Sequence, residues 1–318
     1  MTGRHHPPRD LPKRQRGLAI VTAVLIVAIV SAIAAYLSLG QQVWIRLAQN
    51  LRDRAQAEEA VAGITRAAAQ LLRKDTSSAT DTLQEEWARE LPPFPVEAGA
   101  VKVRITDAQA RFNLNNLIQP GGGLNGAEIG VLRRLLLALS LNPSLADSLV
   151  DWMDPDTSVR PGGAEDAEYL AGTPSYRAAN QPLQSIDELR LVRGFTPEIV
   201  EKLRAHVTVL PGNTTKPVNI NTCGALVLSA LFTDLPYSEA EALVKERDEG
   251  RKTFASTTDL ETRAKKTPAQ DVRYDVKTEF FLVELEAHFG RLERRSLALL
   301  KRPRNNKAAT IEWRSAQL

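Results

Sequence analysis

The hydrophobic pattern of the chain begins with an unbroken apolar run. The run from Leu18 to Leu39 has no charge and no proline. At about 1.5 Å per residue it would form a helix of roughly 33 Å, enough to cross the hydrocarbon core of a bilayer. Only Asp10 opposes the basic residues that precede the run, which are Arg4, Arg9, Lys13, Arg14 and Arg16. The positive-inside rule therefore predicts a cytoplasmic N-terminus, with the rest of the chain across the membrane.

The apolar run continues directly into an amphipathic pattern. No proline occurs from Leu18 to Leu91, and beyond Gly40 apolar residues recur at mostly helical spacings among charged and polar ones. This pattern predicts one helix over residues 18–75, with residues 18–39 as its transmembrane part. The helix would be on the order of 87 Å long, much more than a membrane anchor requires.

Three interpretations of this N-terminus compete. The apolar run could be an uncleaved signal anchor, or a signal peptide cut near the small residues from Ala32 to Ala34. In the third interpretation residues 1–17 are a short basic leader that is cut off between Gly17 and Leu18. The long helix argues against the signal peptide, because cleavage there would discard its apolar half.

An alternating pattern follows the long helix. Three prolines break the chain after Leu91, and the sequence VKVRITDAQARFNLNNL then predicts a strand and a turn leading into a second strand. We assign residues 76–119 to the first part of a sheet.

The rest of the chain divides into a helical middle and a strand-rich end. Residues 120–271 contain short helical patterns separated by turns, whereas residues 272–318 predict three antiparallel strands joined around Gly290 and around residues 304–307. The predicted fold class is therefore α+β. One long N-terminal helix would pack on an antiparallel sheet, and a large all-α domain would be inserted into that sheet.

Two stretches of the helical middle resemble helix-hairpin-helix modules, which are SAM-like elements. They are LQSIDELRLVRGFTPEIVEKLRAHV and the segment that begins VNINTCGALVLSALFTDLPYSEAEALVKERDEG. Such modules bind DNA by offering backbone N–H groups of a glycine-containing hairpin to phosphate. The first stretch keeps Gly194, but the second has Asp234, which repels phosphate, and Pro236, which has no N–H. We therefore predict the modules without nucleic-acid binding.

The segment DWMDPDTSVRPGGAEDAEYL is dense in carboxylates and contains a single basic residue, Arg160. Carboxylates brought together repel one another unless they are solvated or neutralised, and oxygen ligands on a glycine-containing loop suit Ca²⁺. A solvated acidic loop is the alternative. Val159 stands where an EF-hand counted from Asp154 needs glycine, so we predict a structural calcium site of another type. Its candidate ligands are Asp151, Asp154, Asp156, Glu165 and Asp166.

Composition narrows the remaining chemistry. The net charge of +3 and the pI of about 9.0 call for no nucleic-acid partner. Cys223 is the single cysteine, so stability must come from packing or from bound ions. His206 and His288 have no partner at metal-ligand or triad spacing, and no substrate-binding pattern supports Asp154 and Asp156 as glycosidase acids. We predict that the protein is not an enzyme.

The basic leader, its terminal glycine and the long helix together resemble the type IV pilin and pseudopilin class. The resemblance implies that prepilin peptidase cuts after Gly17 and that Leu18 becomes the methylated first residue. Most members of that class have glutamate at the fifth mature position, which is Thr22 here. In the filament that carboxylate meets the N-terminal amine of the adjacent subunit, a neighbour that a tip subunit lacks. Thr22 fits a tip position, although threonine is also common in membrane helices without a special role.

Thr22, the motif FNLNNL, the acidic segment and PVNINT followed by helices are similar to the general secretion pathway protein K family. These proteins are the large minor pseudopilins of type II secretion systems, and the resemblance covers nearly the whole chain. It implies a type IV pilin-like fold whose inserted α-domain holds calcium. It also implies a single-pass protein of the bacterial inner membrane, with most of the chain in the periplasm.

The same resemblance implies a function at the tip of the pseudopilus. There the protein would act with minor pseudopilins I and J, and also H, on the inner-membrane secretion platform. The tip complex would initiate assembly and support export of folded proteins across the outer membrane. The main alternative is a membrane-anchored helix-hairpin-helix DNA-binding protein of a competence apparatus, which a steep salt dependence of DNA binding would favour. An extracytoplasmic hydrolase ranks third.

Overall fold

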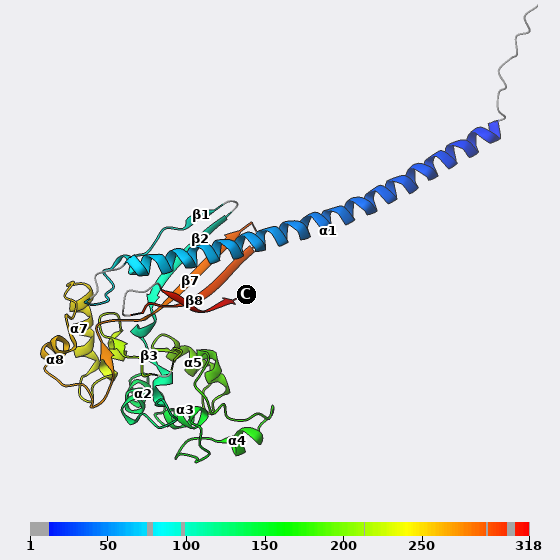
Figure 1. Cartoon of the computed structure of the whole chain (residues 1–318). Coiled ribbons are helices and arrows are strands. Elements are labelled where there is room, and N and C mark those ends of the chain that lie inside the picture. Colours follow the sequence, from blue (N-terminus) through cyan, green and yellow to red (C-terminus); the bar gives the residue numbers. More distant parts are fainter. Residues whose placement is uncertain are drawn as a thin grey trace, which may run out of the picture.

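The most extended feature of the molecule is one long helix. The computed structural model describes residues 13–74, 79–96, 99–212, 214–290, 292–303 and 309–317, so leader residues 1–12 lie outside the described residues. Helix α1 (Lys13–Lys74) projects far beyond the rest of the molecule (Figure 1). All side chains from Leu18 to Arg52 are exposed. In the described part of the chain, α1 is the helix that is long and apolar enough to cross a membrane.

The second feature is a five-stranded antiparallel sheet with the strand order β1-β2-β7-β8-β9. Strands β7, β8 and β9 form the predicted C-terminal meander. Strand β2 pairs with β7 over its whole length, from Gly99 opposite Phe289 to Asp107 opposite Phe281. The strands are β1 (Phe94–Val96), β2 (Gly99–Asp107), β7 (Phe280–Phe289), β8 (Leu292–Lys301) and β9 (Thr310–Gln317).

The C-terminal part of α1 packs on one face of this sheet. Alternate residues of β2 and β7 point toward the helix, and the core also contains Ala57, Ala68 and Leu72 of α1. Burial of each large apolar side chain contributes about 1.5–3 kcal/mol to stability. At the rim, Glu58 of α1 pairs with Arg294 of β8 at 2.9 Å. The sheet therefore holds only the end of the long helix that is remote from the apolar run.

Strand β1 explains how the proline-rich segment is accommodated. Pro95 lies inside β1, opposite Ala100 of β2. Because β1 is the edge strand of the sheet, a residue without an N–H breaks no ladder with a further strand. The short helix η1 (Glu86–Ala88) precedes β1, and its Trp87 packs edge-on against Phe281 at 5.1 Å.

A helical unit lies between β2 and β7 in sequence and below the sheet in Figure 1. One continuous hydrophobic core joins its elements. Its α-helices are α2 (Gly126–Ala138), α3 (Leu145–Met153), α4 (Asp166–Leu170), α5 (Pro197–Arg204), α6 (Ala225–Ala230), α7 (Tyr237–Asp248) and α8 (Thr257–Ala264). Its 3₁₀ helices are η2 (Ala108–Ala110), η3 (Leu114–Leu117) and η4 (Ile186–Leu191). Its short strands are β3 (Phe112–Asn113), β4 (Val207–Thr208), β5 (Val218–Asn219) and β6 (Tyr274–Asp275).

The predicted second strand at FNLNNL is wrong in length and in partner. Strand β3 has only two residues and pairs in parallel with β4, outside the main sheet. The asparagines end the strand because Asn113 Oδ1 accepts from the N–H groups of Asn115 and Leu210, and Asn115 Oδ1 accepts from that of Leu183. The leucines of the motif belong to the core of the helical unit, which therefore begins before residue 120.

A buried polar network joins the sheet to the helical unit. Asp107, at the end of β2, accepts hydrogen bonds from Asn219 Nδ2 at 2.8 Å and from Thr222 Oγ1 at 2.6 Å. The Nδ2 group of Asn219 also donates to the carbonyl of Asp81. The Asp81 carboxylate in turn accepts from the N–H of Thr278 just before β7. The network thus ties the end of β2 and the entry to β7 to the helical unit that they enclose.

Candidate metal centre

The acidic segment connects α3 to α4, at the end of the helical unit far from α1 (Figure 1). Asp151 lies in the last turn of α3, and Asp154 is the residue that caps its C-terminus. Glu165 is the N-cap residue of α4. Because α3 is buried over almost its whole length, the carboxylates at its end are carried into the interior.

Three of the predicted ligands converge. Asp154, Asp156 and Glu165 each offer one carboxylate oxygen, and these oxygens all lie within 4.8 Å of one another. Asp154 is 1% exposed and Glu165 is 4% exposed. In the described part of the chain, neither oxygen of Glu165 has a hydrogen-bond partner, and Oδ1 of Asp154 has none either. Buried carboxylate oxygens without partners are costly, so a cation is the natural counterpart of this arrangement.

The electrostatics of the three carboxylates agree with their geometry. Burial, followed by repulsion from Asp151, Asp154 and Asp156, raises the pKa of Glu165 to about 7. The pKa of Asp154 is raised as well, by burial and then by the charge of Asp156. Burial and mutual repulsion thus both disfavour the charged form of these carboxylates.

The other two predicted ligands are engaged elsewhere. Oδ2 of Asp151 accepts from the N–H of Arg160 at 3.0 Å, and Oδ1 pairs with Nε of Arg160 at 3.1 Å. Asp166 accepts from the N–H of Ala178 at 3.0 Å and pairs with Arg177 at 3.3 Å. The structure therefore brings together three of the five candidates, with Asp151 beside them and Asp166 turned toward another loop.

Two arginines that sequence reasoning did not place hold the loop. Arg160 was visible only as the single base of the segment, and its Nη2 also contacts Oδ2 of Asp154 at 3.3 Å. Arg193 comes from the turn before α5 and donates to the carbonyl of Gly163 at 3.0 Å and to Glu168 at 2.6 Å. No local signal identifies Arg193, because its partners lie far away in sequence.

The loop backbone approaches the carboxylates closely. A Cβ atom on Gly163 would lie 1.9 Å from Oδ2 of Asp151, so only glycine fits there. Trp152 and Tyr169 pack edge to face beside the loop at 5.1 Å, and the Trp152 indole donates to Glu188 at 3.0 Å. The carboxylates are thus held by packed elements.

The donor set fits Ca²⁺. Three carboxylates supply hard oxygen ligands, and Ca²⁺ accepts six to eight oxygens in flexible geometry, so backbone carbonyls or water would complete its shell. Val159 is exposed, and the N–H of Ser158 donates to Asp156, so the loop follows its own course and does not match an EF-hand. When bound, the ion would neutralise the carboxylates and fix the loop between α3 and α4.

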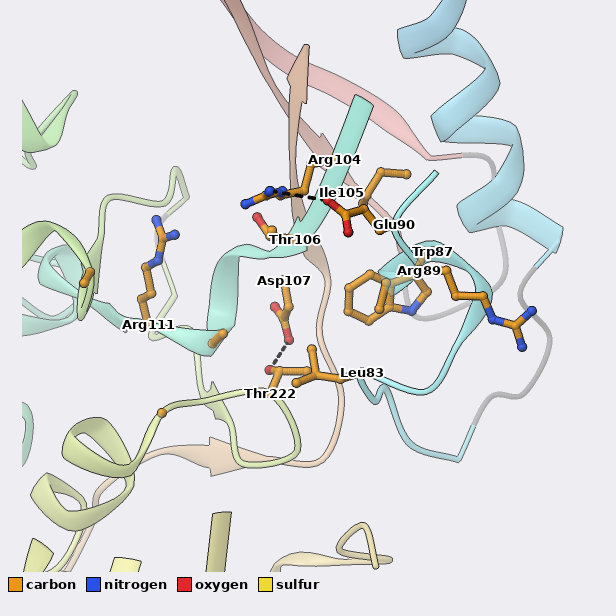
Figure 2. A pocket seen from close by; sticks show the side chains of 14 residues that line it. Leu83, Trp87, Arg89, Glu90, Arg104, Ile105, Thr106, Asp107, Arg111 and Thr222 are labelled. Carbon is orange, nitrogen blue, oxygen red and sulfur yellow. Dashed lines mark hydrogen bonds and ion pairs between the residues drawn. The ribbon is translucent and has the colours of Figure 1, made fainter. Parts of the chain in front are cut away.

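A cleft lies elsewhere, between the sheet and the helical unit. It measures about 470 Å³. Among the residues that line it, Asp107 accepts a hydrogen bond from Thr222, and Arg104 pairs with Glu90 at 3.9 Å (Figure 2). Burial raises the pKa of Asp107 to about 6. Since hydrogen bonds from the protein already engage the Asp107 carboxylate, its role here is to join the two units.

The predicted processing position lies within α1. Gly17 and Leu18 follow the first turn of this helix, which begins at Lys13. The hydroxyl of Thr22 donates to the carbonyls of Leu18 and Ala19, both at 3.0 Å. This hydroxyl is therefore satisfied by its own helix and needs no partner from a neighbouring subunit.

Comparison with known proteins identifies the family. A model of the family "Type II secretion system (T2SS), protein K" matches residues 110–212, and a second of the same description matches residues 218–277. The chain is 33% identical over 308 residues to type II secretion system protein K of Pseudomonas aeruginosa, covering 92% of this chain and 90% of that protein. The chain belongs to the type II secretion system protein K family. This confirms the resemblance drawn from sequence.

Other proteins of the protein K family are also similar to this chain. The Aeromonas hydrophila protein of the same name is 32% identical over 322 residues, with 94% of this chain and 96% of that protein covered. Among solved structures, a chain of the GspK-GspI-GspJ complex from enterotoxigenic Escherichia coli superposes with a TM-score of 0.72 at 26% identity. The match covers 85% of this chain and 99% of that one. The two family matches together span the helical unit that contains the acidic loop.

Proposed function

We propose that this protein is a minor pseudopilin that occupies the tip of a type II secretion pseudopilus, initiates its assembly and so supports export of folded proteins. One observation carries the proposal: a long helix with a fully exposed apolar half is combined with a bulky helical unit at the opposite end of the molecule (Figure 1). The exposed half offers lateral contacts to helices of sister subunits in the membrane. The helical unit enlarges the end of the molecule remote from the apolar run, where a further subunit would have to stack.

The proposal places α1 in the bacterial inner membrane as a single span. The basic residues before Leu18 would keep the N-terminus in the cytoplasm, and the sheet and helical unit would lie in the periplasm. Prepilin peptidase would cut between Gly17 and Leu18, and Leu18 would then be methylated. The partners would be minor pseudopilins I, J and H and the secretion platform. The relative solved as a GspK-GspI-GspJ complex supports the first two.

Thr22 is consistent with a tip position. A glutamate there would need a cation in an apolar environment, whereas the Thr22 hydroxyl is bonded within its own helix. The subunit can therefore occupy a place where no neighbour above supplies an N-terminal amine.

We include in this proposal a structural Ca²⁺ bound by Asp154, Asp156 and Glu165. It is supported by the buried carboxylate oxygens that have no hydrogen-bond partner among the residues that the structure describes. The ion would stabilise the loop between α3 and α4 and take part in no reaction.

The mass of the mature protein tests the proposal directly. We expect the chain purified from its own membrane to begin at Leu18 and to carry one methyl group. Intact-mass spectrometry with N-terminal fragmentation measures both features. A mature chain that begins at Met1 or near Ala35 would contradict the pseudopilin assignment.

The competing function is a membrane-anchored DNA-binding protein of a competence apparatus, and one observation favours it. Gly194 lies between η4 and α5 with φ +84°, as a helix-hairpin-helix turn requires. In the second copy, Pro236 immediately precedes α7, where it offers no N–H to phosphate. Fluorescence anisotropy with a labelled duplex decides between the two functions. We expect no binding, whereas salt-sensitive binding would support the competence protein.

A further inference from the structure

The acidic loop contains a cation of its own. Arg160 reaches back from the loop to the end of α3, where its side chain is only 24% exposed. Nε lies 3.1 Å from Asp151, and Nη2 lies 3.3 Å from Asp154. A guanidinium remains charged at every relevant pH and is more weakly hydrated than an ammonium group, which suits it to a buried position.

The two oxygens of Asp154 face different cations. Oδ2 contacts Arg160, whereas Oδ1 is buried without a hydrogen-bond partner within the described residues. The unpartnered Glu165 oxygens and an oxygen of Asp156 complete the group to which Asp154 belongs. Asp154 therefore divides the cluster into an arginine-filled half and a half that is open to an ion.

The formal charges of the cluster also separate a part balanced by Arg160 from a part that needs an ion. Asp151 and Arg160 together are neutral. The remaining three carboxylates carry three negative charges, and one divalent ion leaves a single negative charge that water and backbone dipoles can accommodate. A second divalent ion would raise the positive charge of the cluster to five, counting the first ion and the guanidinium, and the repulsion among these cations is only weakly screened there.

We infer that Arg160 acts as a tethered second cation of the acidic cluster, so that the loop takes one divalent ion where the carboxylates alone would take two. This inference rests on the calcium site proposed above. It makes Arg160 a positioning residue that sets the number of ions, because it occupies the carboxylate oxygens that a second ion would need.

The test counts bound calcium in the full chain, purified in detergent and stripped with a chelator. Equilibrium dialysis followed by atomic emission gives the ions per chain. We expect about one ion for the wild type and about two for Arg160→Gln, which frees Oδ1 of Asp151 and Oδ2 of Asp154 while the backbone N–H of residue 160 still bonds to Oδ2 of Asp151. Arg160→Lys keeps the positive charge and should bind about one.

Arg177→Gln is the matched control. It removes the same charge from the same unit, but Arg177 is exposed and pairs with Asp166, outside the converging carboxylates. It should bind about one ion. Because loss of Arg160 leaves uncompensated carboxylates, Arg160→Gln should also depend more strongly on calcium for its melting temperature than the wild type does.

The outcomes separate the inference from the site on which it rests. A wild type that binds no calcium refutes the proposed site itself. A wild type that binds two ions, or an Arg160→Gln chain that folds and still binds one, overturns the role of Arg160 and leaves the calcium site intact. Failure of Arg160→Gln to fold even in calcium also overturns it, since a second ion should replace the lost charge.

Discussion

At the residue scale, Glu165 is the side chain that most needs a positively charged partner. It is buried, and both of its oxygens lack partners in the described structure. We expect Glu165→Gln to abolish the calcium-dependent rise in melting temperature, because it removes a charged ligand. In chelator near pH 8 the variant should be about 1 kcal/mol more stable than the wild type, since an unpaired buried charge is gone. Differential scanning fluorimetry with and without calcium measures both effects.

The exposed Glu168→Gln is the control for this experiment. Glu168 pairs with Arg193 on the surface and does not belong to the converging carboxylates. The calcium-dependent shift should therefore persist in Glu168→Gln. If it persisted equally in Glu165→Gln, Glu165 would be no ligand.

Glu128 makes the stability of the fold depend on pH. Burial raises its pKa from 4.5 to about 7, against hydrogen bonds from the Arg273 N–H and from Asn116. A carboxyl whose pKa is raised by folding contributes stability that is fully present below about pH 4.5 and lost as the pH rises through about 7. Glu128→Gln should therefore gain on the wild type by about 2 kcal/mol between about pH 5 and pH 8.

Urea unfolding at several pH values measures this difference. Glu249→Gln, at the exposed residue that follows α7, serves as its control. A Glu128→Gln difference that stays constant with pH would mean that Glu128 is ionised in the fold over the whole range.

At the element scale, the end of β2 depends on one asparagine. Asn219 is fully buried and donates from one amide group to Asp107 and to the carbonyl of Asp81. We expect Asn219→Ala to destabilise the protein by about 2–4 kcal/mol, because it removes hydrogen bonds to two buried acceptors, the Asp81 carbonyl and the Asp107 carboxylate. Urea unfolding of the full chain gives the free energy, and the exposed Gln181→Ala should change it by less than about 0.5 kcal/mol. A similarly small effect for Asn219→Ala would show that the junction rests on other contacts.

The same scale shows what local pattern can and cannot predict. The long helix and the strands β7 to β9 follow from continuous apolar periodicity and local turns, which one sequence displays. FNLNNL was misread because the asparagines bond to backbone groups about 70 and 97 residues away, such as those of Leu183 and Leu210. The pairing of β5 with β6 is equally non-local.

The acidic loop, too, could be predicted from the sequence only in part. Its carboxylates were found from their density in sequence, and three of the five candidates converge in the fold. The turn of Asp166 toward Arg177 and the insertion of Arg160 depend on side-chain packing, which spacing does not encode.

At the scale of the whole molecule, the helical unit behaves as an insertion between two strands that are already paired. Asp107 lies opposite Phe281, so a short Asn-Gly turn in place of residues 109–279 could close β2 and β7 into a hairpin. Phe280, Leu282 and Leu299 would need polar replacements, because the deletion uncovers them. If the unit caps the fibre, the shortened subunit should enter the fibre shaft, and immunogold label should move from the ends to the length of overproduced pseudopili. Label that remained at the ends would assign the capping role to the rest of the chain.

The partial burial of α1 has a mechanical consequence. Its first buried residue is Ala57, whereas the apolar run ends at Leu39, which leaves about 27 Å of rod between bilayer and head. A stiff rod gripped at one end works as a lever. Tilting it by roughly 10° in the lipid would swing its far end, some 70 Å from the bilayer centre, sideways by roughly 12 Å. With α1 placed in the membrane as proposed above, a small change in its tilt would thus move the sheet and the helical unit over a much larger distance.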